Sequence, residues 1–201
     1  GAVSPAGGDL SDPVVQATQR IVKVFWGLDS SLAYKRHFPA INWLTSYSLY
    51  MDTLAPWYTE QFGEGYMANR TKSMHILQEE SELQEIVRLV GQDALSPADR
   101  LTMETAKMIR EDFLQQNAFH AEDTCVPMEK QFKMMETILY LYEKCRALIN
   151  RGMPVSVLKE DNIFERVIAI KYDVPNNKPE MFDQYKADID RFYDNVLERN
   201  G

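Results

Sequence analysis

The chain has 201 residues, of which 45% are hydrophobic and 11% aromatic, enough apolar side chain to build a folded core. Its formal net charge of −8 argues against binding to nucleic acids or to anionic lipid surfaces, because both need a basic face. No apolar run is long enough to span a bilayer, and the first ten residues lack the charged and apolar regions of a secretory signal.

The first 45 residues predict mostly loop with one strand. The first dozen are rich in Gly, Pro, Ser and Asp, which is typical of a loop. Residues 20–26 are β-branched and aromatic and predict a short buried strand that ends at Gly27. A single strand leaves its backbone groups unpaired, so we expect its partners to lie upstream of this chain. A short helix capped at Asp29 should run to Arg36, and residues 38–43 predict a loop.

The remainder of the chain predicts helices. Apolar side chains recur at helical spacing, and Gly or Pro residues separate the periodic segments. Ser96 at the N-cap, Pro97 at the first helical position and Asp99 two residues later are typical of a firm helix start. The expected helices cover residues 49–62, 66–90, 97–115 and 127–150, a short segment around 163–170, and a final segment around 182–196.

Motifs for autonomous catalysis are missing from the sequence. It contains no G-x-x-x-x-G-K-[ST] phosphate loop, no G-x-G-x-x-G and no G-x-S-x-G. The three histidines His37, His75 and His120 are far apart and predict no metal site. Cys125 and Cys145 suggest neither a disulfide framework nor a zinc site, which favours a cytoplasmic setting. We therefore assign no catalytic or metal-binding residue within this chain.

Three clusters have both a structural and a functional interpretation. The acidic side chains at 79, 80, 82 and 85 are better explained as a solvated helix face than as carboxylate chemistry. The methionines at 128, 134 and 135 are better explained as core filling than as an adaptable binding surface. The pair Gly7-Gly8 is interpreted as a turn. From composition and spacing alone the chain would be a helical domain of unknown function.

Several segments, taken in order, resemble one family. They are GGDLSDPV at 7–14, FWGLD at 25–29, RHFPAINW at 36–43, SYSL at 46–49, LQEIVRLVG at 83–91 and IREDFLQQNAFH at 109–120. Together they resemble the catalytic A subunit, also called the alpha chain, of V-type rotary ATPases, including the archaeal and bacterial forms. The resemblance covers nearly the whole chain and is weakest after about residue 155.

The resemblance implies a mainly α fold. Residues 46–201 would form the C-terminal helical bundle domain, and residues 1–45 would be the remnant of the nucleotide-binding α/β domain that precedes it. The phosphate loop and the general-base glutamate of the family would lie upstream. The resemblance therefore implies that this chain alone is inactive, holds no cofactor and binds ATP weakly, and we expect it to be a monomer.

The resemblance also implies an adenine pocket. By similarity to the related beta subunit of F-type ATP synthases, Phe38 would face the adenine ring, and Ala118 and Phe119 would close the other side. An apolar slot of this kind buries the base while the phosphates are held elsewhere. The alternative is that both phenylalanines pack in the core, and the residues alone favour that alternative. With the family resemblance we favour the pocket.

A lever is the second implied feature. Asp93, Ala94, Leu95, Ser96, Pro97, Ala98 and Asp99 align with the acidic helix–turn–helix of the beta subunit that pushes on the rotor. This segment has only two acidic residues, so a contact based on charge alone is not implied. The alternative is an ordinary helical hairpin without a rotor contact.

The full catalytic subunit would hydrolyse or make ATP, with ATP or ADP and Mg²⁺ bound, and drive H⁺ or Na⁺ through a membrane sector. Its implied partners are B subunits in an alternating A/B hexamer, the central stalk and the peripheral stalk. The subunit would lie on the cytoplasmic side, peripheral to the membrane. Neither membrane insertion nor binding to nucleic acid is implied. Two alternatives remain. One is a stand-alone helical protein-interaction module, and the other is an autonomous enzyme that uses His120 or the acidic residues 79–85.

Overall fold

The computed structural model describes residues 1–5 and 7–200, so Ala6 and the last residue of the predicted second domain, Gly201, lie outside the described residues. These residues form two compact units. The first unit comprises residues 1–70 and 115–117, and the second comprises residues 71–114 and 118–201. The domain boundary expected between residues 45 and 46 stays a prediction.

A three-stranded sheet forms the centre of the first unit. The strands are β1 (Ala2–Val3), β2 (Val24–Leu28) and β3 (Ile41–Ser48), in the order β1-β2-β3. β1 is parallel to β2, and β2 is antiparallel to β3 with Val24 opposite Ser48 and Leu28 opposite Ile41. The ring of Phe25, which is 1% exposed, stacks on Tyr47 with centroids 5.8 Å apart. The sheet thus has an apolar face held by cross-strand contacts.

Two strand predictions for this unit were wrong. The strand expected at 20–26 begins at Val24 and continues through Gly27 to Leu28. It is not a lone strand, since β1 and β3 pair with its two edges. Residues 38–43 were expected to form a loop, but β3 begins at Ile41 because its backbone completes the ladder with β2. Tertiary pairing here overrides a local sequence that contains Pro and Asn.

The helices of the first unit have clear start signals. The carboxylate of Asp12 accepts hydrogen bonds from the N–H groups of Val14 and Val15 at 2.7 and 3.2 Å and caps α1 (Pro13–Gln19), which was not predicted. Asp29 caps α2 (Ser30–Tyr34) as expected, although α2 ends two residues before Arg36. α3 (Met51–Phe62) follows β3, and α4 (Gly65–Val90) begins in this unit and continues from residue 71 in the second.

The second unit is a helical bundle, which confirms the predicted fold class. After α4, the chain enters a short turn and a long series of helices connected by brief loops. The elements are η1 (Gln92–Ala94), α5 (Pro97–Lys107), the π-helical η2 (Met108–Leu114), α6 (Ala121–Thr124), α7 (Met128–Asn150), η3 (Val155–Asn162), α8 (Ile163–Asp173), η4 (Pro179–Met181) and α9 (Phe182–Asn200).

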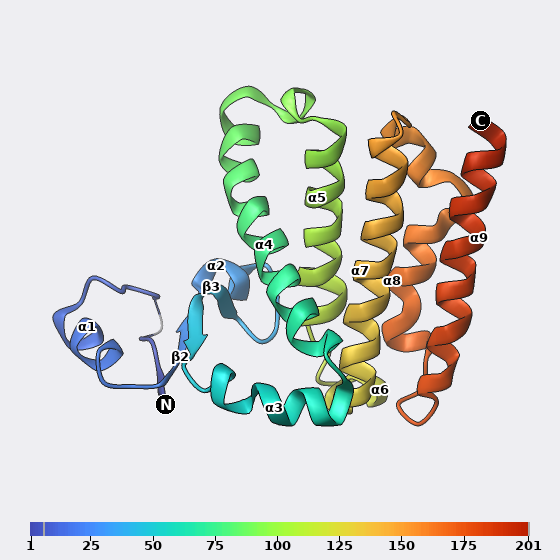
Figure 1. Ribbon diagram of the computed structural model, residues 1–201. Coiled ribbons are helices and arrows are strands. Elements are labelled where there is room, and N and C mark those ends of the chain that lie inside the picture. The colour runs from blue at the N-terminus through green and yellow to red at the C-terminus, as the bar shows by residue number, and fades with distance from the viewer. Residues whose placement is uncertain (6, 201) are drawn as a thin grey trace. The chain divides into compact units, whose positions relative to one another are not determined.

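The core of the bundle is centred on α7, which packs against α5, α8 and α9 (Figure 1). Its side chains at 134, 138, 141, 145 and 148 are at most 2% exposed and follow the helical spacing that the sequence predicts. Both core methionines, Met134 and Met135, are buried, so the core-filling interpretation is correct for them, whereas Met128 is 38% exposed. Each fully buried apolar side chain contributes roughly 1.5–3 kcal/mol.

Charged contacts join α4 to other helices of the bundle. Arg110 Nε lies 3.1 and 2.9 Å from the two carboxylate oxygens of Glu80, and Arg110 Nη2 lies 2.8 Å from Oε1. Glu80 is 3% exposed, so the predicted solvated acidic face is wrong for this residue. Lys72 forms an ion pair with Glu143 of α7. These contacts fix α4 within the second unit.

Candidate functional site

The Phe38 segment is held by backbone hydrogen bonds in the first unit. The N–H of His37 donates to the carbonyl of Leu32 at 2.9 Å, and the N–H of Asp29 donates to the carbonyl of Ala40 at 3.0 Å. The Phe38–Pro39 peptide bond is cis. His37 is buried and lies against Trp43, whereas the Phe38 ring is 56% exposed. Phe38 therefore does not pack in the core, and the alternative interpretation of this residue is wrong.

A distant part of the chain joins this segment. The N–H of Gln116 donates to the carbonyl of Phe38 at 2.6 Å, and the Gln115 side chain donates to the carbonyl of Arg36 at 3.5 Å. Residues 115–117 accordingly belong to the first unit. The chain segment that leads into Ala118 is thus hydrogen-bonded to the backbone of Phe38.

Ala118 and Phe119 belong to the second unit, where they precede α6. The hydroxyl of Thr124 donates to the carbonyls of Ala118 and His120 at 2.9 and 2.8 Å. His120 Nδ1 accepts the N–H of Glu122 at 3.2 Å and caps α6. The Phe119 ring is 100% exposed, so it too lies outside the core. That Phe38 and Phe119 form one adenine slot stays a prediction.

The predicted lever lies between α4 and α5. Ser96 and Asp99 form a reciprocal capping box: the N–H of Asp99 donates to Ser96 Oγ at 3.1 Å, and the N–H of Ser96 donates to Asp99 Oδ2 at 3.2 Å. Leu95 is buried at 7% exposed, and the rest of the lever is exposed or half-buried. Leu89 and Val90, in the last turn of α4, are 78% and 65% exposed. Residues 93–99 therefore lie between two exposed apolar side chains and a firm helix start, and their role as a lever stays a prediction.

A pocket of about 460 Å³ lies beside the lever within the second unit. Leu95 and Leu101 come from the lever side, and Leu158 and Phe164 come from η3 and α8. Charged side chains, among them Arg100, line the same pocket. Nothing in the sequence indicated this pocket, because its two halves are more than fifty residues apart.

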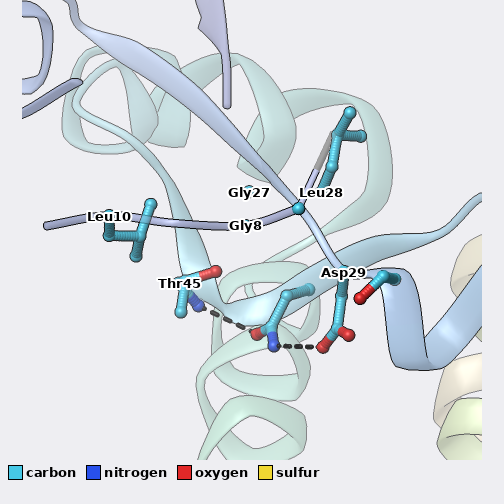
Figure 2. A pocket seen from close by; sticks show the side chains of 9 residues that line it. Gly8, Leu10, Gly27, Leu28, Asp29 and Thr45 are labelled. Carbon is cyan, nitrogen blue, oxygen red and sulfur yellow. Dashed lines mark hydrogen bonds between the residues drawn. The ribbon is translucent and has the colours of Figure 1, made fainter. Parts of the chain in front are cut away.

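A smaller, polar pocket of about 170 Å³ lies in the first unit (Figure 2). Asn42 Nδ2 donates to Asp29 Oδ2 at 3.0 Å, and Asn42 Oδ1 accepts the N–H of Thr45 at 3.1 Å. The hydrogen bond from the Ser31 hydroxyl is the largest of the causes that lower the pKa of Asp29. A Cβ on Gly27 would lie 2.3 Å from Thr45 Oγ1, so only glycine fits beside β3.

Sequence reasoning missed this smaller pocket, although the Gly7-Gly8 pair was a usable signal. Gly8 has φ +66°, and a Cβ there would lie 2.8 Å from the carbonyl oxygen of Leu28. Gly8 therefore allows a close approach to β2 in addition to the expected turn, whereas a Cβ on Gly7 would meet nothing within 4 Å. Figure 2 shows Gly8 beside Leu28, with the side chains of Leu10, Asp29 and Thr45 around the pocket.

Neither a metal-binding cluster nor a membrane-spanning helix is present among the described residues, 1–5 and 7–200. They contain no group of three or more His, Cys, Asp or Glu side chains arranged to hold a metal ion. None of the helices in this part of the chain has the length and apolarity needed to cross a membrane.

Two family models match the chain. Residues 55–157 match the C-terminal domain of V and A type ATP synthase, and residues 1–48 match the nucleotide-binding domain of the ATP synthase alpha/beta family. Over all 201 residues the chain is 50% identical to the V-type ATP synthase alpha chain of Clostridium botulinum (strain Okra / Type B1), of which it covers 34%.

The chain belongs to the V- and A-type ATP synthase alpha-chain family. Other members are similarly close: the V-type ATP synthase alpha chain of Acetivibrio thermocellus is 52% identical over 94% of this chain and 32% of that protein. The V-type ATP synthase alpha chain of Thermoanaerobacter pseudethanolicus is 50% identical over 98% of this chain and 33% of that protein. The predicted family is confirmed, and the chain spans about a third of the length of these relatives.

A solved structure shares the fold at lower identity. The ATP synthase subunit NeqB of Nanoarcheaum equitans aligns with a TM-score of 0.54 and 21% identity, over 68% of this chain and 32% of that chain. In the present chain, the family models assign residues 1–48 to a nucleotide-binding domain and residues 55–157 to a C-terminal domain.

Proposed function

We propose that this chain supplies the adenine-side wall and a mechanical lever of an ATP synthase catalytic subunit. The identity of about 50% over the whole chain to V-type ATP synthase alpha chains carries this proposal. The complete subunit couples ATP hydrolysis or synthesis to the transport of H⁺ or Na⁺ across a membrane. It does so in an alternating hexamer with B subunits, on the cytoplasmic side and peripheral to the membrane, connected to a central and a peripheral stalk.

The adenine wall is proposed to consist of Phe38, Ala118 and Phe119. Two exposed aromatic rings on short, hydrogen-bonded segments are suited to a flat base, because an aromatic face stacks on a base with little loss of side-chain freedom. The backbone bond from Gln116 to Phe38 brings the residue two positions before Ala118 to Phe38. The chain's part in the chemistry is to hold the base, and no residue of this chain is assigned to the phosphates or to Mg²⁺.

Nucleotide affinity tests the adenine wall. In the complete subunit, together with its partners, Phe38→Ala and Phe119→Ala should each raise the KM for ATP about threefold to tenfold, since an aromatic stacking contact is worth about 0.5–1.5 kcal/mol. Tyr34→Ala is the matched control, because Tyr34 is 88% exposed in the same unit as Phe38. An unchanged KM in both phenylalanine variants would rule out the adenine wall.

The lever is proposed to comprise residues 93–99 and to contact the central stalk. Support comes from the capping box, which makes the start of α5 firm, and from the exposed Leu89 and Val90 next to it. An apolar contact of this kind needs fewer acidic residues than a contact based on charge. Residues 93–99 would then transmit movement of the bundle to the central stalk.

Coupling tests the lever. The double variant Leu89→Ser with Val90→Ser should reduce ATP-driven ion transport more than ATP hydrolysis, because it weakens the stalk contact and leaves the nucleotide site intact. Val14→Ser, which alters a 73% exposed side chain of α1, serves as the control. Equal transport per ATP hydrolysed in the lever variant and the parent would refute the proposed contact.

A further inference from the structure

The second unit contains a cluster of buried charges next to the Ala118–Phe119 segment. Asp123 of α6, Lys130 of α7 and Lys171 of α8 are 1%, 1% and 3% exposed. Lys171 Nζ lies 3.6 Å from Asp123 Oδ2, and Lys130 Nζ donates to the carbonyl oxygen of Lys171 at 2.8 Å. We call these three residues the ion cluster. It joins the short helix α6 to the first turn of α7 and to the last turn of α8.

Buried charges of this kind are costly, and their presence is weak evidence of a stabilising role. Desolvation of a buried ion pair offsets much of its Coulomb attraction, and apolar side chains of the same volume often stabilise a fold as well or better. Burial lowers the pKa of Lys171, and the neighbouring Asp123 opposes that shift. A buried pair does, however, favour one arrangement of its elements over others. The ion cluster is therefore suited to holding a segment of the chain in one defined position.

Further contacts connect the end of α8 and the loop after it to α6 and its two capping residues. The His120 ring lies 4.5 Å from the Tyr172 ring, measured between centroids, and a Glu122 carboxylate oxygen accepts the N–H of Asn176 at 2.6 Å. Asn176 Nδ2 donates to the carbonyl of Cys125 at 3.2 Å. Residues 120–125 thus contact Tyr172 of α8 and Asn176 in the loop that follows α8.

The hydroxyl of Thr124 completes the connection to the proposed adenine wall. It follows Asp123 directly and donates to the carbonyls of Ala118 and His120 at 2.9 and 2.8 Å, on either side of Phe119. A displacement of α6 would therefore move both backbone groups that flank Phe119. The Phe119 side chain itself is exposed.

We infer that the ion cluster, through Thr124, positions Ala118 and Phe119 and thereby sets the affinity of the complete subunit for its adenine nucleotide. Asp123, Lys130, Lys171 and Thr124 are positioning residues in this account, since they act through the segment that they hold. The inference rests on the proposed adenine wall. In this inference, the role of the ion cluster is to position a segment and not to add to the apolar packing of the bundle.

Thr124 offers a surface test that leaves the buried charges intact. In the complete subunit with its partners, Thr124→Val should raise the KM for ATP about threefold with kcat changed less than twofold, because it removes one hydrogen-bonding group worth about 1 kcal/mol. Thr124→Ser keeps the hydroxyl and should restore the KM of the parent. A KM that is equal in the Val and Ser variants overturns the inference.

Asp123→Asn tests the ion cluster itself, with Asp188→Asn as a matched control. Asp188 is also buried and pairs with Arg166 and Arg191 in the same unit, so both variants lose one buried carboxylate charge. Both should lower the Tm, but only Asp123→Asn should raise the KM for ATP, by about threefold or more. Equal KM values in the two variants at the same loss of Tm would show a purely structural role and overturn the inference.

Phe119→Ala separates failure of this inference from failure of the proposed function. If Phe119→Ala raises the KM while Thr124→Val and Asp123→Asn do not, the adenine wall stands and the positioning role is wrong. If none of these three variants changes the KM and Phe38→Ala leaves it unchanged as well, the adenine wall and the positioning role are both wrong.

Discussion

Arg110 forms an ion pair with a buried carboxylate of the bundle. Its guanidinium holds a Glu80 carboxylate that is only 3% exposed, through three nitrogen–oxygen distances between 2.8 and 3.1 Å. Removing the arginine leaves a buried, charged carboxylate without its counterion. The cost of such a loss is far larger than that of breaking a surface pair.

Arg110→Met should therefore lower the free energy of unfolding by about 3 kcal/mol, as measured by urea denaturation. Arg88→Met breaks an exposed pair with Glu85 three residues away and should cost less than about 0.5 kcal/mol. A loss for Arg110→Met no larger than that for Arg88→Met would contradict the assignment of Glu80 as a buried ion.

Asp112 gives the bundle a pH dependence. Burial, and then the charge of Glu111, raises the pKa of Asp112 from 3.8 to about 6. Between these two values the folded chain keeps a proton that the unfolded chain has lost. The free energy of unfolding should consequently fall as the pH rises from about 4 to about 6. Above that range the full loss of free energy, which is the penalty for ionising the buried Asp112 carboxyl, should persist.

Asp112→Asn removes this penalty. The variant should be more stable than the parent at pH 7–8 by roughly 1 kcal/mol, a figure reduced for partial solvent screening, and the difference should vanish near pH 4. Urea denaturation of both chains at the two pH values measures this. A difference that is the same at pH 4 and pH 8 would assign it to packing instead of ionisation.

Single residues differ in how far sequence alone could place them. The helical spacing of Met134, Ile138 and Leu141 predicts their burial, because one helix face is enough to decide it. Glu80 could not be predicted as buried, since its partner lies thirty positions later in the chain. The exposure of Phe38 ran against the residue-based expectation of a core position.

Among the elements, the start of α5 is set most clearly by local sequence. Ser96, Pro97 and Asp99 predict the helix start, and the structure has the full capping box there. The same kind of signal was overlooked at α1, where Asp12 caps the helix and Pro13 occupies its first position. β3 could not be predicted in the same way, because its strand conformation depends on pairing with β2.

Ser96→Ala should lower the free energy of unfolding by about 1 kcal/mol, because it leaves the N–H of Asp99 without its side-chain acceptor. Ser81→Ala, in the interior of α4, is the control and should be nearly neutral or slightly stabilising. Urea denaturation of the two variants and the parent provides the comparison. Equal effects of the two substitutions would show that the capping box contributes little to the firmness of α5.

At the scale of the whole molecule, sequence predicted the family and the mainly α class, and the comparisons confirm both. The bond from Gln116 to Phe38 could not be predicted, because nothing local relates residues so far apart in sequence. The buried ion cluster was missed for the same reason, since its three members come from three helices. The proposed site depends on contacts between residues that are far apart in the sequence. Local sequence patterns do not predict such contacts.

The most direct test of the adenine wall is photolabelling of the complete subunit, with its partners bound, by 2-azido-ATP, followed by mapping of the labelled tryptic peptides. Cleavage after Arg36 and Arg70 releases a peptide that contains Phe38, and cleavage after Arg110 and Lys130 releases one that contains Ala118 and Phe119. Our account predicts that label from the catalytic site, competed by excess ATP, is found in one or both of these peptides. Competed label that is found only in other peptides would contradict it.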